Sequence, residues 1–180
     1  METKKEEFEK LYKKGIEHFS KKNYPRAISY WLKYIKSKQD NFRAFVYLGM
    51  AYFEVKEYDL AIENYQRAIA INPDYAKAFN NLGNAYRKKG FLSEAIESYH
   101  KAITLDPCNV SYHYNLGITD QDVGEYKEAI REFLVVLEKE PENHEIRREL
   151  ISAYYRADLY SEEDRKSTRL NSSNVSQFRM

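Results

Sequence analysis

The sequence predicts an all-α fold, a solenoid of about four and a half stacked helix-turn-helix units. Small and aromatic residues recur every 34 residues in three series: Gly15, Gly49, Gly83 and Gly117; Ala27, Ala61, Ala95 and Ala129; Trp31, Tyr65, Tyr99 and Phe133. Three prolines close successive units at the same interval: Pro73, Pro107 and Pro141. A period in this size range is typical of architectures in which each unit packs on its neighbours.

The stretch from Phe42 to Tyr75 shows how one unit is built. Its first half carries one helical stripe, spaced i, i+3, i+4 and i+7: Phe45, Leu48, Gly49 and Tyr52. Its second half repeats the spacing i, i+4 and i+7: Ala61, Tyr65 and Ala68. Pro73 follows the second stripe and ends the second helix, because proline cannot continue a helix. The unit is therefore a helix, a turn and a second helix.

The small residues of each unit predict a close approach between its two helices. Gly49 and Ala61 leave room for the backbones, while Tyr52 and Tyr65 fill the volume around the contact. An interior glycine costs a helix about 1 kcal/mol relative to alanine. A glycine at the same position in four units therefore indicates a contact that requires it.

These residues resemble the tetratricopeptide repeat family. The family pattern stands here as FVYLGMAY, AIENYQRA and Pro73, and again as FNNLGNAY, AIESYHKA and Pro107. The resemblance covers roughly residues 8–160. It implies a right-handed solenoid that serves protein–protein interaction, although the fold alone identifies no partner.

The repeats divide residues 1–163 into units at about 8–41, 42–75, 76–109 and 110–143, with a partial unit at 144–163. The first unit is degenerate, and we interpret it as an N-terminal cap. After residue 163 the pattern stops. Residues 164–173, DRKSTRLNSS, resemble a translated sequencing adapter, so we expect 164–180 to be an artefactual tail or else a disordered polar one.

The fourth unit departs from the pattern at two positions of its first helix. His113 stands in the slot of Phe45, and Asp120 stands in the slot of Tyr52. The two are seven positions apart, about 10 Å along a helix, so we expect no direct pair. Burial of an unpaired carboxylate is costly, so we expect Asp120 to reach solvent or a helix end.

Composition excludes several classes of function. The net charge is +1, from 29 basic and 28 acidic side chains, which gives no overall attraction to nucleic acid or to anionic membranes. No apolar run typical of a signal peptide or a membrane span is present, so we expect a cytoplasmic protein. The lone Cys108 excludes an intrachain disulfide.

The sequence also predicts no catalytic, metal or cofactor site. Its four histidines are scattered and share no metal-ligand spacing: His18, His100, His113 and His144. The repeated glycines lie inside expected helices and so form no phosphate-binding loop. We therefore expect the chain not to be an enzyme.

The family resemblance implies a concave groove lined by the first helices of successive units. The candidate groove residues are Lys77, Asn80, Asn81, Asn84, Arg87, Lys88, Tyr114, Asn115, Tyr47, Met50 and Phe53. An asparagine amide offers one acceptor and two donors, which matches a peptide unit. Asn81 and Asn115, one repeat apart, could hold a ligand backbone at two points, with an apolar anchor on the residues of the second unit.

Two sub-types of the family can be compared with these residues. In the clamp that binds heat-shock-chaperone carboxylates, Asn84 and Asn115 match, but Glu145 and Glu149 stand where Lys and Arg close the clamp. Acidic residues would repel a carboxylate, so we expect no such clamp. The run NNLGN at 80–84 is similar to the asparagine ladder of O-linked N-acetylglucosamine transferases, but Tyr47 interrupts it.

The sequence thus favours a non-catalytic scaffold that binds an extended peptide or partner segment. One alternative is the targeting arm of a larger enzyme, such as a glycosyltransferase, truncated near residue 163. Another is a module for self-association. Partner identity cannot be read from the residues.

Overall fold

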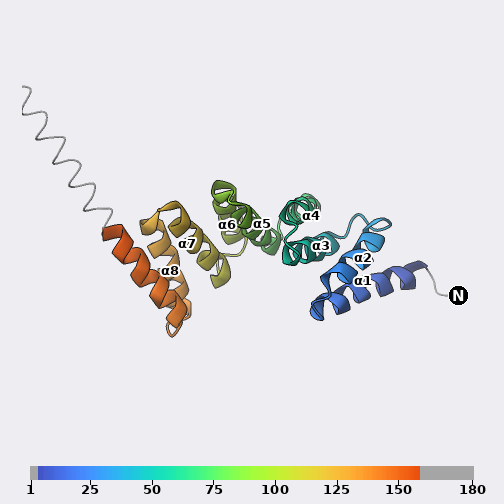
Figure 1. The fold of residues 1–180 in the computed structure, drawn as a ribbon, viewed down its shortest axis with the longest axis horizontal. Coiled ribbons are helices and arrows are strands. Elements are labelled where there is room, and N and C mark those ends of the chain that lie inside the picture. Colours follow the sequence, from blue (N-terminus) through green and yellow to red (C-terminus); the bar gives the residue numbers. More distant parts are fainter. Residues whose placement is uncertain (1–3, 159–180) are drawn as a thin grey trace, which may run out of the picture. The chain divides into compact units, whose positions relative to one another are not determined.

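The computed structural model describes residues 4–158 and is helical throughout that range, with no strand (Figure 1). Eight helices are α1 (Lys4–Ser20), α2 (Tyr24–Ile35), α3 (Phe42–Glu54), α4 (Tyr58–Ile71), α5 (Ala76–Lys89), α6 (Leu92–Leu105), α7 (Val110–Val123) and α8 (Tyr126–Lys139). A further helix covers residues 144–158. The fold is the predicted all-α solenoid of helix-turn-helix repeats. The expected tail at 164–180 lies outside the described residues.

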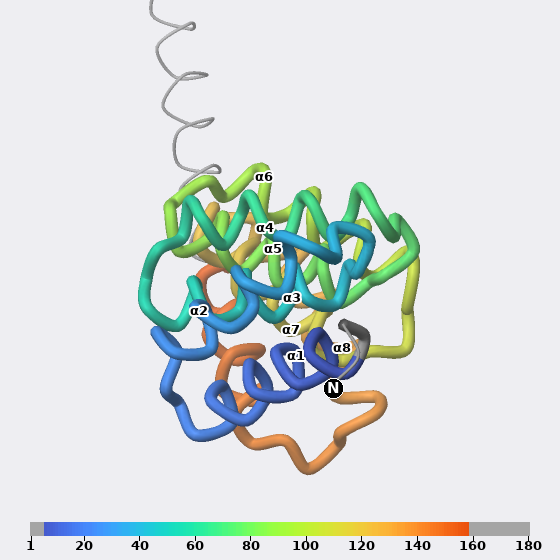
Figure 2. Tube along the Cα trace, turned by 90° about the vertical axis from the view of Figure 1, so that its right-hand side faces the viewer, coloured from blue at the N-terminus to red at the C-terminus, as the bar shows by residue number. Residues whose placement is uncertain are grey.

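The chain divides into two compact units, Met1–Tyr112 and His113–Met180. In the first unit each helix contacts the next along the chain, from α1 to α6. The first helices of its hairpins also contact one another, α1 with α3 and α3 with α5. Figure 2 shows α3 between α1 and α4. The first helices of the repeats therefore form a continuous layer in this unit.

Each of the four complete repeats packs an aromatic ring on the backbone of a glycine. A β-carbon built on Gly49 would lie 2.6 Å from Cε1 of Tyr65, and one on Gly117 would lie 2.7 Å from Cε1 of Phe133. Trp31 likewise covers Gly15. The rings at these positions are 2 % exposed or less. The expected close approach at glycine is confirmed, because no side chain fits beneath the ring.

The turn between the two helices of a repeat places one residue in the left-handed region. Gly90 ends α5 with φ of 82°, and Gly124 follows α7 with φ of 87°. The same position holds Lys56, with φ of 66°, and Lys22, with φ of 57°. These four residues share the 34-residue spacing. The turn geometry is thus repeated although only two of the residues are glycines.

Asparagines cap the first helix of several repeats. Asn41 Oδ1 accepts hydrogen bonds from the backbone N–H groups of Arg43, at 3.1 Å, and Ala44, at 3.3 Å. Asn109 accepts one from Ser111, and Asn143 accepts one from Ile146. Such caps satisfy N–H groups that have no partner inside the helix.

The expectation that Asp120 reaches solvent is wrong. Its side chain is buried, with 5 % exposure. Burial, together with the charges of Glu132, Glu128 and Glu125, raises the pKa of this carboxyl to about 7, against a smaller opposing effect of Arg131. The carboxyl group of Asp120 therefore keeps its proton up to nearly neutral pH.

His113 finds its partner on the neighbouring helix. Its Nδ1 lies 2.6 Å from Oε2 of Glu132 on α8, and its side chain is buried. The slot that holds Phe45 in the second repeat is therefore filled here by a histidine whose polar edge is satisfied.

Candidate functional site

A hollow of about 160 Å³ opens between the first helices of the second and third repeats. Its walls come from α3, α5 and the second helix α4: Met50, Phe53, Glu54, Tyr65, Asn81 and Asn84. Because α3 and α5 belong to the layer of first helices, the hollow lies on that layer. It brings together four of the residues that the sequence assigned to the groove.

Asn81 carries an amide that is not tied to the protein. Its Nδ2 is buried and has no hydrogen-bond partner among the described residues. A buried donor without a partner costs about 1–3 kcal/mol. Rotation of the amide toward the hollow breaks no hydrogen bond of Nδ2, so a ligand carbonyl can supply the missing acceptor.

Asn84 is already oriented by a neighbouring repeat helix. Its Oδ1 accepts a hydrogen bond of 2.8 Å from the Tyr99 hydroxyl. With the oxygen engaged, the amide nitrogen is the group that Asn84 offers to the hollow. Asn84 Nδ2 and, after rotation of its side chain, Asn81 Nδ2 are therefore the donors that the two residues can offer to the hollow.

The floor of the hollow is apolar, and one of its walls is acidic. In the third repeat, Asn84 accepts a hydrogen bond from Tyr99. The residue of the second repeat that is equivalent to Asn84 is Met50, whose thioether is only a weak acceptor. Burial raises the pKa of Tyr65, and the charge of Glu54 raises it further, so the hydroxyl stays protonated. Glu54 adds a carboxylate that can accept from a ligand N–H.

Glu54 was not among the residues assigned from the sequence. It stands 34 positions before Lys88, which was assigned, so the repeat period was the signal that could have found it. Its charge is opposite to that of Lys88. The two repeats therefore present different electrostatics at the same position.

The other assigned residues lie elsewhere. Tyr47 packs against Trp31, with ring centroids 5.3 Å apart and planes 16° from parallel. Asn80 is buried, at 8 % exposure, and contributes little surface. The remaining α5 residues do not line the hollow; Lys77 and Lys88 are exposed and Arg87 is half-buried.

Tyr114 and Asn115 belong to the second unit and are half-buried there. The Tyr114 hydroxyl donates to Oε1 of Glu145 at 3.2 Å. Nearby, Gln121 Nε2 donates to the backbone carbonyl of Glu149 at 3.1 Å. Both bonds join α7 to the helix of residues 144–158.

Residues 4–158 contain no group of three or more His, Cys, Asp or Glu side chains placed to hold a metal ion. In the same range no helix is long and apolar enough to cross a bilayer. Cys108 is exposed.

The fold is a stack of helix-turn-helix repeats with a hollow on the first helices, and this arrangement defines a class of repeat proteins. Comparison with known families identifies the class. The model described as TPR repeat matches residues 51–90 and 83–119. The model described as tetratricopeptide repeat matches residues 114–163. The chain belongs to the tetratricopeptide repeat family.

Solved structures support the same assignment. A crystal structure of MamA is 32 % identical, with 77 % of this chain and 81 % of that chain covered and a TM-score of 0.72. MamA 41-end from Desulfovibrio magneticus RS-1 is 31 % identical, with 76 % and 77 % covered and a TM-score of 0.71. The first TPR of Spaghetti (RPAP3), bound to the HSP90 peptide SRMEEVD, is 27 % identical, with 64 % and 92 % covered and a TM-score of 0.63. A search of curated proteins found no match.

Proposed function

We propose that this chain is a non-catalytic interaction scaffold that binds an extended peptide segment over the first helices α3 and α5. The observation that carries the proposal is the hollow in which Asn81 and Asn84 face Met50 and Phe53. The two amides donate to ligand carbonyl groups, and Glu54 accepts from a ligand N–H. These contacts bind the peptide backbone and depend little on the side chains of the ligand.

The apolar residues of the hollow supply the anchor. Met50 and Phe53 are half-buried, and an apolar ligand side chain placed on them leaves water at both surfaces. Methionine and aromatic residues are enriched at interfaces. The basic residues farther along α5 would favour acidic ligand residues next to the anchor: Lys77, Arg87 and Lys88.

The comparisons support peptide binding as a class of function. The RPAP3 repeat domain shares the fold and holds a peptide from HSP90. In the present chain Glu145 and Glu149 occupy the positions at which a carboxylate clamp would need basic residues. We therefore propose an internal, extended segment as ligand rather than a free C-terminus.

Selection of peptides from a random library, followed by calorimetric titration, tests this function. A transient interaction near micromolar affinity corresponds to about −8 kcal/mol. Asn81→Ala should weaken binding by about 1–3 kcal/mol, because a ligand carbonyl group loses its donor. Asn84→Asp keeps an acceptor for Tyr99 and replaces the donor with a negative charge, so it should weaken binding to ligand carbonyl groups; a thermal melt checks that the variant folds.

The matched control is Gln66→Ala, which removes an exposed amide from the second helix α4. It should leave peptide affinity unchanged. Selected peptides that bind the asparagine variants as tightly as the unaltered chain would refute the proposed site.

Self-association is a second candidate, favoured by one observation. Large apolar residues are exposed on the helix of residues 144–158: Ile151 at 68 %, Tyr154 at 49 % and Tyr155 at 67 %. Light scattering over a concentration series tests it. A mass that stays at the 21.5 kDa of one chain would exclude this role.

A further inference from the structure

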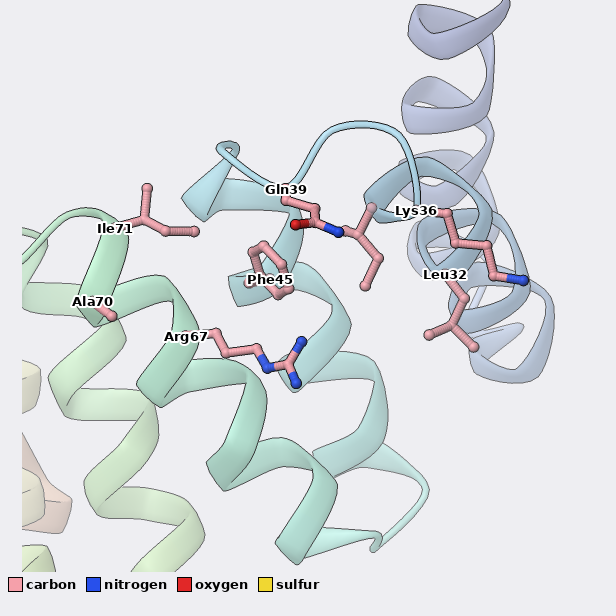
Figure 3. A pocket seen from close by; sticks show the side chains of 8 residues that line it. Leu32, Lys36, Gln39, Phe45, Arg67, Ala70 and Ile71 are labelled. Carbon is pink, nitrogen blue, oxygen red and sulfur yellow. The ribbon is translucent and has the colours of Figure 1, made fainter.

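A second, larger hollow lies away from the groove, between the second helices α2 and α4. Its volume is about 450 Å³. Phe45 of α3 lies at its centre in Figure 3, with Leu32 on the α2 side and Ile71 on the α4 side. We call this feature the α2–α4 hollow. It has no part in the groove on α3 and α5.

The hollow exists because the first repeat ends its second helix early. By the 34-residue period, the end of α4 at Ile71 corresponds to Ser37, but α2 stops at Ile35. Gln39 stands at the position that holds Pro73 in the next repeat. Although α1 contacts α3 and α3 contacts α5, no such backbone contact joins α2 to α4. Phe45 borders the hollow, although its side chain is only 4 % exposed.

The apolar wall on α2 differs from the equivalent surface of the next two repeats. Leu32 is 38 % exposed, and the equivalent residues of the next two repeats are the polar Gln66 and His100. Ile71 is 39 % exposed on the opposite wall. Contiguous apolar surface rimmed by polar groups marks interaction sites on soluble proteins.

The rim is basic. Lys36, which follows α2, and Arg67 of α4 line the hollow, and none of its lining residues is acidic. Figure 3 shows Arg67 extending from α4 below Phe45, toward the α2 side. Its Nη2 pairs with Glu63 Oε1 at 2.8 Å, and both side chains are more than half exposed. Such exposed pairs contribute little, so a ligand carboxylate can replace Glu63.

We propose that the α2–α4 hollow docks a short acidic segment of a partner protein. One large apolar side chain of that segment packs on Phe45 between Leu32 and Ile71, and its carboxylates bind Arg67 and Lys36. Charge complementarity selects this occupant, because an apolar floor alone would accept any hydrophobic group, whereas the cationic rim favours acidic flanks. The chain then has two binding surfaces, one on its first helices and one on its second helices.

The test uses a fluorescent, amidated peptide with a leucine-phenylalanine pair flanked by glutamates, and measures binding by anisotropy. The peptide should bind the unaltered chain. Arg67→Glu and Leu32→Ser should each weaken binding by about tenfold. Both residues are exposed, so these variants should fold. A peptide with glutamine flanks, and one with serine in place of the apolar pair, should bind more weakly.

Lys101→Glu is the matched control, since Lys101 stands one repeat after Arg67 and the charge change is the same. Lys101→Glu should leave the affinity for the acidic peptide unchanged. Asn81→Ala, which alters the groove on α3 and α5, should also leave this affinity unchanged. Equal loss in Lys101→Glu would show non-specific attraction and overturn the proposal. Loss in Asn81→Ala would place the peptide in the groove and also overturn it.

Two further outcomes would overturn the proposal. One is absence of binding by the glutamate peptide to the unaltered, folded chain. The other is a dimer in sedimentation that Leu32→Ser dissociates, which would identify a second copy of the chain as the occupant. Circular dichroism melts of every variant establish that a loss of binding does not come from unfolding.

Discussion

The ring of Tyr65 lies against the backbone of Gly49, and the contact leaves no space for a methyl group. The same pairing joins Gly83 to Tyr99 and Gly117 to Phe133. Each ring is held between the two helices of its repeat, so the contact determines how closely the hairpin closes. At the scale of single residues, this is the interaction on which the repeat depends.

Gly49→Ala should destabilise the chain although alanine is the better helix former. The added β-carbon would meet Tyr65 at 2.6 Å, and overpacking of this kind costs about 1–3 kcal/mol. The gain of about 1 kcal/mol in helix propensity is smaller or comparable. Urea denaturation of the variant measures the net effect.

A double-mutant cycle with Tyr65→Leu isolates the contact. The smaller side chain makes room for the methyl group, so the loss from Gly49→Ala should be smaller in the Tyr65→Leu background. Additive effects of the two substitutions would show that the ring and the glycine do not interact.

Asp120 gives the fold a pH dependence. Its pKa is about 7 in the folded chain and near 3.8 when exposed, so between these values the folded state binds more protons than the unfolded state. Stability should therefore fall as pH rises from about 4 through about 7. Asp120→Asn keeps the shape and removes the charge, and should stabilise the chain by about 2 kcal/mol at about pH 8.

Thermal melts at about pH 5 and about pH 8 check this expectation. The gain from Asp120→Asn should be small at the lower pH, where the native carboxyl is protonated. Asp122→Asn, an exposed change on the same helix, should retain the pH dependence of the unaltered chain. An equal effect of Asp120→Asn at both pH values would contradict the burial of a protonated acid.

At the scale of the helices, the turns inside the hairpins carry unequal strain. Lys22 and Lys56 take the left-handed conformation that Gly90 and Gly124 take at the equivalent positions. The left-handed conformation costs a residue with a β-carbon about 1–2 kcal/mol of conformational free energy, whereas glycine adopts it without this cost. The two N-terminal hairpins therefore close at a cost that the later ones avoid.

Lys56→Gly should stabilise the chain by about 0.5–1 kcal/mol, because relief of backbone strain exceeds the greater freedom of glycine in the unfolded state. Guanidinium denaturation midpoints give the measurement. Gly90→Lys is the reverse change, and should cost a similar amount, since nothing lies within 4 Å of a β-carbon there and only the backbone is affected. An unaltered midpoint in Gly90→Lys would refute the role of turn strain.

The helices could be predicted because the residues that define them are packing residues. Gly49 and Tyr65 recur by period, and the structure places them in direct contact. The burial of Asp120 could not be predicted in this way. The repeat pattern gives the position of Asp120 in its helix but not the arrangement of the acidic neighbours on α8. The left-handed Lys56 was also missed, since lysine is not a turn signal.

The candidate site was predictable in its residue types and less so in its boundaries. Met50, Phe53, Asn81 and Asn84 come together in one hollow. Asn80 is buried beside them, because a shift of one position on a helix turns a side chain by a large angle. Glu54 was not predicted, because an acidic residue matches none of the amide, apolar and basic types expected in the groove.

At the scale of the whole molecule, the chain contains two compact units, Met1–Tyr112 and His113–Met180. The proposed peptide hollow and the α2–α4 hollow both lie within the first unit. Repeat proteins derive stability from contacts within repeats and between neighbours. Binding at one hollow can therefore be examined through local protection of the helices that line it.

Hydrogen–deuterium exchange of the chain with and without a library-selected peptide tests whether a peptide binds over α3 and α5. Exchange should slow in these two helices, whose residues line the peptide hollow, and should not slow in Asn81→Ala at the same peptide concentration. Protection confined to other helices, or equal protection in Asn81→Ala, would contradict this prediction.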